Sequence, residues 1–448
     1  MPHSWLGRVS AILAALFPFV AIGSLWADTA PPQVEIPARI LPVDRGFINQ
    51  LMADEPVLQP IYDAGFRFHF DVAGSESLGF DGQHDGSVLQ GRLFDYLNNR
   101  PNLDQLDLKL YRPVNIYDDK WNIGGMLDVG YGRDFSFVHS NGILDLHTYK
   151  SFTDPNLQFA VNQANVQIGA PHLKLTVGEW ANPFGLETID PMDGRYSVLS
   201  RGFAYTYGLP KTLTGAELAF SPWDHGEFYG GVTRGWDQGL NDDNSSIDGI
   251  LGYKQRIANG LHWSIGGTYG PEFAEDNVDG RGMVDSTLCY DPCDCPFCCA
   301  LDFLYWHEWH EADSVSFAQE PFHSNVVGAG FYSQYRVIPN LAIVDRLEWY
   351  HDSSGYSLNV PDQPGQTYVP PQRMMDFVEP GRSYEMYDLS VGFKVDLFRG
   401  GKLPRIELVP EYRLDYSDRK VFGQSNGSSS GGSNYVQQTL DLSILARF

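Results

Sequence analysis

The feature that most constrains this chain is an alternation of apolar and polar residues with a period of two. In one run, Trp121, Ile123 and Leu127 alternate with Asn122 and Asp128, which is the pattern of a half-buried strand. The clearest runs cover residues 120–131, 260–270, 384–398 and 436–448. Strands of ordinary sheets have mostly about five or six residues, whereas a tilted strand needs about 9 to 11 to cross a bilayer. The length of these runs therefore favours a membrane barrel over a soluble sandwich.

The composition agrees with this interpretation. The chain is 43% hydrophobic and 14% aromatic, and only 19% of its residues are charged, against about 25% in typical globular proteins. This balance is expected where half of each strand faces lipid and aromatic residues mark both interfaces. After the N-terminus no stretch approaches 18 uninterrupted apolar residues, so a membrane-inserted chain of this kind must close as a barrel.

The connections between the runs alternate between short and long. Short turns are expected at residues 221–226, 258–260, 339–340 and 399–402, and long connections at residues 132–156, 271–325 and 352–383. Short turns in the periplasm and long loops outside are typical of outer-membrane barrels. The sequence therefore predicts an all-β fold, a transmembrane antiparallel up-and-down β-barrel of about 14 strands (an even number between 12 and 16), with short periplasmic turns and long external loops.

The N-terminus predicts export. Arg8 precedes an apolar run from Val9 to Trp26, and the small residue Ala27 follows, so residues 1–27 are expected to be a cleaved signal peptide. An uncleaved membrane anchor is the alternative, which Pro18 and Gly23 disfavour because they weaken a long helix. Residues 28–60 form a polar, Pro-rich lead-in, and residues 61–448 are assigned to the barrel.

The C-terminus is expected to close the barrel. The last alternating run ends in an aromatic residue, Phe448. The last strand must pair with the first to remove both free edges, and an aromatic terminus can anchor at the interface. We expect outer-membrane lipid and, through this C-terminal strand, the barrel-assembly machinery as partners.

The charge balance argues against a nucleic-acid partner. The net charge is -25, with 31 Lys plus Arg against 56 Asp plus Glu, and nucleic-acid binding needs a basic footprint. Excess carboxylate suits acidic loops that only keep the protein soluble, or a pore lining that favours cations.

The middle of the chain resembles the putative β-barrel porin family of the OmpL-like type, particularly the versions found in planctomycete bacteria. The resemblance covers roughly residues 65–271. The residues that carry it are Gln105–Val114, Trp121–Gly132, Val177–Glu187 with the sequence Asn-Pro-Phe-Gly at 182–185, Thr212–Ala219 and Gly230–Trp236. It implies an outer-membrane channel without catalytic residues. The Cys-rich insertion after Pro271 departs from the family pattern.

That insertion, at residues 271–325, is expected to be an external loop. It holds thiols and imidazoles at high density: Cys289, Cys293, Cys295, Cys298, Cys299, His307 and His310. In an exported protein disulfide formation is the default, with one thiol left over from five. A zinc or other soft-metal site and unpaired thiols remain open alternatives. The two His are three apart, which is not the spacing of the metalloprotease motif.

Charged residues on strand faces opposite apolar sets are expected to point into the lumen, because Arg or Lys on the lipid face costs about 2 to 4 kcal/mol at the midplane. The pore-lining candidates are Arg234, Lys254, Arg256, Arg346, Glu348, Lys394, Asp396, Glu407, Glu411, Arg413, Asp415 and Arg447. They can tune selectivity, or they can simply pair with one another.

The sequence therefore predicts an outer-membrane porin that passes small hydrophilic solutes or ions by passive diffusion, with a preference for cations. No cofactor and no enzymatic activity are expected, and a homotrimer is one assembly that the sequence allows. The runner-up is a structural or adhesive barrel whose Cys-rich loop binds a partner. An outer-membrane hydrolase comes third, because no Ser and His can be paired from the sequence.

Overall fold

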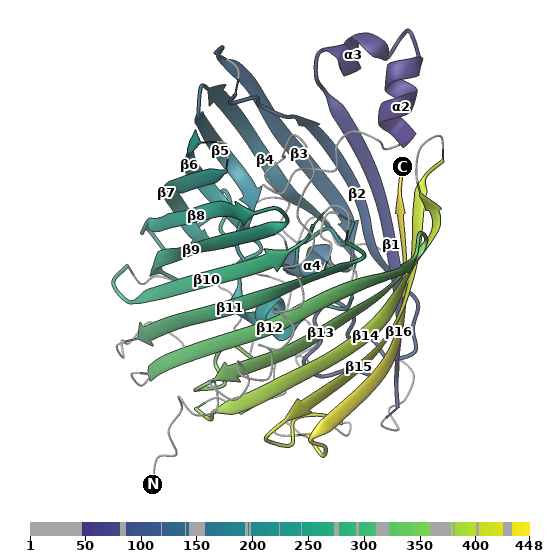
Figure 1. Cartoon of the computed structure of the whole chain (residues 1–448). Coiled ribbons are helices and arrows are strands. Elements are labelled where there is room, and N and C mark those ends of the chain that lie inside the picture. The colour runs from purple at the N-terminus through teal and green to yellow at the C-terminus, as the bar shows by residue number, and fades with distance from the viewer. Residues whose placement is uncertain are drawn as a thin grey trace. The chain divides into compact units, whose positions relative to one another are not determined.

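The computed structural model (Figure 1) describes most of the chain from Phe47 onwards. The described residues are 47–80, 87–117, 119–138, 140–142, 157–192, 196, 199–223, 225–242, 244–272, 277–292, 295–310, 322–358, 378–379, 381–399, 403–423 and 432–448. The expected signal peptide, residues 1–27, lies outside them.

Sixteen strands in the described part of the chain form one closed antiparallel barrel in which each strand pairs with its neighbours in sequence. β1 pairs with β16, so the last strand closes the barrel. The strands are β1 (Arg67–Gly79), β2 (Asn102–Arg112), β3 (Asn122–Gly132), β4 (Gln158–Ala170), β5 (Leu173–Ala181), β6 (Thr212–Trp223), β7 (Gly226–Trp236), β8 (Asp248–Ala258), β9 (Leu261–Pro271), β10 (Gly280–Tyr290), β11 (Phe297–His310), β12 (Phe322–Ile338), β13 (Leu341–Asp352), β14 (Tyr384–Arg399), β15 (Arg405–Ser417) and β16 (Val436–Arg447).

The prediction of a Cys-rich external loop at residues 271–325 is wrong. Residues 280–290 and 297–310 are the paired barrel strands β10 and β11, joined by a short turn. They alternate like the other strands: Val284 and Phe303 are exposed on the outer face, while Met283 and Leu304 are buried. The two strands that the estimate of about 14 lacked lie here, because Cys, His and Asp had concealed their apolar face.

A helical segment precedes the barrel. α2 (Phe47–Asp54) and α3 (Gln59–Asp63) lead into β1, so the expected lead-in is partly helical and the barrel begins at Arg67, not at residue 61. Asn49 fixes α2 to the first strand, because its side chain accepts a hydrogen bond from the Phe68 N–H (2.8 Å) and donates one to the Phe68 carbonyl (3.0 Å). None of the helices in the described residues is long and apolar enough to cross a membrane.

The outer face of the barrel is apolar. Outward positions on many strands carry exposed aliphatic or aromatic side chains, among them Leu127, Val177, Leu251, Leu389 and Leu442. Such a face suits contact with hydrocarbon. The alternation expected in residues 120–131, 260–270, 384–398 and 436–448 is confirmed, since β3, β9, β14 and β16 occupy these ranges.

The two ends of the barrel differ in their connections. Turns of two residues, at 171–172, 224–225, 259–260 and 339–340, follow even-numbered strands, while the longest connections, 80–101, 133–157, 182–211 and 353–383, follow odd-numbered ones. We call these the turn end and the loop end. In barrels of this type the turn end faces the periplasm.

Segments from the loop end fold into the barrel instead of remaining outside. Three of them belong to residues 87–98, to residues 133–138 with the short helix α4 (Phe135–Val138), and to residues 182–211 with the π-helical turn η2 (Ala204–Gly208). Their apolar side chains, including Phe94, Phe135 and Phe203, share one buried cluster with inward residues of the wall such as Ile250 and Met283. The loop half of the barrel interior is therefore packed.

Candidate functional site

The candidate site is the barrel interior, and the segment that shapes it most is the β5–β6 connection. We call the described part of residues 182–211 the inserted segment. It reaches the wall at Arg346 of β13, which is fully buried. One terminal nitrogen of Arg346 donates to Glu187 Oε1 (3.0 Å) and to the carbonyl of Ser200, and the other donates to Asp388 on β14 (2.7 Å). This guanidinium thus ties the segment to two strands.

Carboxylates on the same side hold the backbone of the inserted segment. Glu348 accepts hydrogen bonds from the N–H groups of Phe203 (2.6 Å) and Ala204 (2.7 Å), which lie at the start of η2. Glu411 accepts from both the N–H and the hydroxyl of Ser200, each at 2.7 Å. Charge-assisted hydrogen bonds of this kind are stronger than neutral ones. These hydrogen bonds hold the inserted segment against β13–β15.

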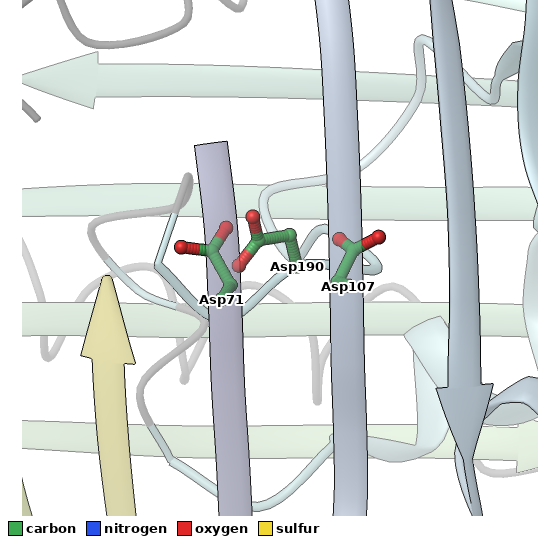
Figure 2. A group of neighbouring side chains, drawn as sticks. All are labelled: Asp71, Asp107 and Asp190. Atoms are coloured by element: carbon green, nitrogen blue, oxygen red, sulfur yellow. The ribbon is translucent and has the colours of Figure 1, made fainter. Parts of the chain in front are cut away.

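A second anchor lies where the barrel closes. Asp190 of the inserted segment lies between Asp71 of β1 and Asp107 of β2 (Figure 2), and one carboxylate oxygen from each lies within 4.8 Å of the others. The ammonium of Lys109 contacts Asp190 and lies 3.4 Å from Asp107 Oδ2 and 3.9 Å from Asp71 Oδ2. Arg447 binds both Asp71 and Asp190 at 2.6 Å. Two cations of the chain, Lys109 and Arg447, thus balance two of the three carboxylates.

The segment from β1–β2 is anchored in the same way. The buried Arg92 donates to Asp415 of β15 (3.0 Å) and to the hydroxyl of Thr439 of β16 (2.8 Å), and also pairs with Asp95. Burial alone would lower the pKa of Arg92, but the surrounding carboxylates, Asp415 first, raise it well above its ordinary value. Arg92 therefore stays charged and fixes the segment to the closing strands.

In two other residues of the loop-end segments, Asp134 and Lys211, burial disfavours the charged form of the side chain. Burial, reinforced by the charge of Asp104, raises the pKa of Asp134 to about 7. Burial also lowers the pKa of Lys211 to about 8, against the opposing effect of Asp237. Lys211 donates to the carbonyls of Tyr205 and Leu209, both at 2.6 Å, and so closes the end of η2.

One part of the inner wall remains open. In the turn half of β4–β9 a set of inward side chains stays partly exposed, beside others that are buried, such as Thr176, Ala219 and Tyr229. In the loop half the same strands are buried at residues such as Ala160, Leu213 and Ile250. Three inward positions of this wall are glycines, Gly178, Gly215 and Gly231, so no side chain projects into the lumen there. We call this surface the open wall: Gln163, Asn165, Gln167, Lys174, Gly178, Gly215, Glu217, Gly231, Lys254 and Ser264. It is polar, whereas the ion pairs that anchor the inserted segment lie on β1, β2, β13 and β16. The start of the segment also bonds β10, where the Gly185 N–H donates to Asp285 at 2.9 Å.

Eleven of the twelve pore-lining candidates lie on the inner face by their strand alternation: Lys254, Arg256, Arg346, Glu348, Lys394, Asp396, Glu407, Glu411, Arg413, Asp415 and Arg447. Arg234 does not. The β6–β7 register shifts between Leu213 and Gly215, which places Arg234 in a bulge at the loop end. Its side chain is 41% exposed and bonds Asp242.

Most of these inward charges are paired rather than free. Lys394 binds Glu407 at 3.0 Å, and Arg413 binds Asp388 and Asp415. The structure adds charged and polar residues that the sequence analysis did not single out. Lys174 and Glu217 of the open wall alternate with apolar neighbours and could have been found by that signal. Arg92, Glu187 and Asp190 lie in connections, where alternation gives no information.

The Cys and His residues do not converge. Cys298 and Cys299 are successive residues of β11, so their side chains point to opposite faces; Cys298 is 2% exposed and Cys299 lies outside. Cys289 lies on the inner face of β10 and Cys295 in the turn, and all four are free thiols. His307 points outward and stacks on His323 at 6.1 Å between ring centroids. Cys293 and the His310 side chain lie outside the described residues. Disulfide pairing is not seen among the described cysteines, because strand geometry separates them.

The C-terminal residue extends the closing pair. The Phe448 N–H donates to the Phe70 carbonyl at 2.9 Å, and the two rings lie 5.8 Å apart.

Comparisons with known proteins give one family and one fold. A family model described as "Putative beta-barrel porin-2, OmpL-like" matches residues 63–448. Among solved structures, the outer membrane channel DcaP of Acinetobacter baumannii is similar over 86% of this chain and 97% of its own, with a TM-score of 0.53 and 12% identity. OprB of Pseudomonas putida is similar over 88% and 96%, with a TM-score of 0.51 and 11% identity. An anion-selective porin from Comamonas acidovorans is similar over 86% and 99%, with a TM-score of 0.50 and 9% identity. No curated protein matches the sequence.

Proposed function

We propose that this chain, which belongs to the family of putative β-barrel porins of the porin-2, OmpL-like type and is a bacterial outer-membrane barrel, passes small hydrophilic solutes or ions by passive diffusion along its open wall. The observation that carries the proposal is the partial exposure of inward polar side chains in the turn half of β4–β9, while apolar residues cover the outer face. A polar surface inside an apolar shell offers hydrogen bonds to a solute in transit.

The inserted segments limit the size of the solute. They bury the inward faces of β4–β9 in the loop half, for example at Ala160, Leu213 and Thr268. A solute must therefore pass a constriction at the loop end before or after it reaches the open wall. This constriction favours the passage of small solutes over large ones.

A preference for cations is part of the proposal. It is supported by the net charge of -25 and by the inward carboxylates at the loop end, such as Asp248, Glu308 and Asp352. A lumen and mouth with excess negative charge raise the local concentration of cations.

A structural barrel with a filled interior is the second candidate. The packed cluster in the loop half favours it, because an unbroken core would stop conduction. The structure does not favour the adhesive version, since the four described Cys residues lie in β10, in β11 and beside the start of β11 rather than in an external loop.

The test is the conductance of the refolded protein in a planar bilayer under a salt gradient. We expect stable ohmic steps and a reversal potential of the sign that cation preference requires. Silence from protein shown to be folded by heat-modifiable gel migration would support the filled barrel instead. An anion-selective reversal potential would contradict only the preference.

A further inference from the structure

Two charged side chains of the open wall differ from the other charges of the interior. Lys174 of β5 and Glu217 of β6 have no hydrogen-bond or ion-pair partner in the described part of the chain, and both are partly exposed. By contrast, Arg346 and Arg413 are buried and hold carboxylates at 2.7 Å. Charges that the fold has not neutralised, facing water inside the barrel, are available to a solute.

Across four neighbouring strands these charges form two carboxylates flanked by two cations: Lys174 on β5, Glu217 on β6, Glu227 on β7 and Lys254 on β8. Glu217 stands opposite Thr176, so Lys174, two residues along the same face, is its diagonal neighbour. The charges that act on Glu217 are those of Lys174 and Lys254 and, in the opposite sense, that of Glu227. Lys254 of β8 stands opposite Glu227 of β7. We call Lys174, Glu217, Lys254 and Glu227 the charge ladder.

The position of Lys254 within the ladder is fixed by an aromatic ring. Its ammonium lies 5.0 Å from the ring centre of Tyr229 and 3.9 Å from Glu227 Oε1, beyond hydrogen-bond length. Tyr229 itself is held against the wall by two glycines. A Cβ at Gly252 would lie 2.1 Å from its Cζ, and one at Gly266 would lie 2.3 Å from its hydroxyl. The ring therefore supports the ammonium beside Glu227.

We propose that the charge ladder binds small zwitterions, solutes with an ammonium and a carboxylate, as they pass along the open wall. A carboxylate meets Lys174 or Lys254, and the ammonium of the same molecule meets Glu217 or Glu227. A solute with one charge is attracted by half of the ladder and repelled by the other half, and a neutral solute gains neither contact. This inference rests on the proposed channel and names its solute class.

Swelling of proteoliposomes that contain the full barrel tests the inference with two probes of equal composition. Glycine is a zwitterion, and glycolamide is its uncharged isomer. We expect glycine to enter faster than glycolamide through the wild-type protein. In the Lys174→Met, Glu217→Gln double variant the ratio of the two rates should fall about two- to fivefold, the range of an exposed ion-pair contact. The glycolamide rate should not change.

Two further variants separate binding from folding. Arg382→Met with Glu379→Gln removes one charge of each sign from an exposed pair outside the barrel wall and should keep the wild-type ratio. Lys174→Glu with Glu217→Lys restores both signs in exchanged places and should recover most of the glycine advantage. Equal wild-type rates, or an unchanged ratio in the Lys174→Met, Glu217→Gln variant, would overturn the ladder and leave the channel standing. No swelling with either solute would overturn the channel, and the ladder with it.

Discussion

Charged residues inside this barrel mainly form ion pairs that hold the inserted segments to the wall. Each buried guanidinium that anchors an inserted segment contacts at least one carboxylate of another element, as Arg346 does with Glu187 and Asp388. Breaking a buried pair by removing one partner leaves an uncompensated charge and is costly. Charge in the lumen therefore does not by itself mark a residue that touches solute. Exposure separates the two roles, and it places Lys174 and Glu217 on the side of solute contact.

Asp134 gives a pH prediction at the residue scale. Its pKa is raised to about 7 in the folded protein, by burial and then by Asp104, from an ordinary value of 3.8. Between these values the folded state binds more protons than the unfolded state, so the free energy of unfolding should fall as pH rises from about 4 to about 7 and then level off. Asp134→Asn should lack this fall and so unfold at higher urea than the wild type at pH 8.

Urea unfolding of the two proteins in lipid at about pH 5 and pH 8 measures this effect. The shift sets an upper limit of about 4 kcal/mol on the difference. Asn can still accept the hydrogen bond that Gln105 donates to Asp134 at 2.8 Å. A variant that is equally destabilised at both pH values would show that packing, not ionisation, governs this position.

At the scale of elements, strands could be predicted and inserted segments could not. β3, β9, β14 and β16 are regular because each outward position needs an apolar residue against lipid. β10 and β11 were missed because Cys299 and His307, at outward positions of β11, interrupt that rule. The inserted segments have no periodic signal: Glu187 and Asp190 acquire their roles only from wall residues far away in sequence, such as Arg346 and Arg447.

The β10–β11 turn allows a direct test of topology. Cys295 is exposed at the turn end, so a variant that keeps only this cysteine should not react with a large PEG-maleimide on intact cells. It should react once the outer membrane is permeabilised. The control is Leu240→Cys in a background from which all native cysteines are removed. Leu240 is exposed in the loop-end connection between β7 and β8, so this thiol should react on intact cells. Labelling of Cys295 on intact cells would contradict the periplasmic position of this turn and support the external loop that the sequence predicted.

On the scale of the whole molecule, the interior is divided. One side is filled by segments that salt bridges hold against β13–β16 and β1–β2, and the opposite wall, β4–β9, remains polar and open in its turn half. The apolar exterior suits contact with the membrane, the ion pairs hold the inserted segments in place, and the proposed path of the solute runs along the open wall. The sequence predicted the barrel, and eleven of its twelve charged candidates lie on the inner face. It did not predict which side of the lumen is filled, because that depends on where the loops dock.

The measurement that tests this account most directly is modification of the open wall during conduction. Gln167→Cys, in a background without the native cysteines, places a thiol on the inner face of β4, and Val177→Cys places one on the outer face of β5, where Val177 is 48% exposed. With a water-soluble methanethiosulfonate reagent in the bilayer chamber, we expect the current through Gln167→Cys to fall in discrete steps and that through Val177→Cys to stay constant. A steady current through Gln167→Cys, with the thiol shown by mass spectrometry to be modified, would contradict a passage along the open wall.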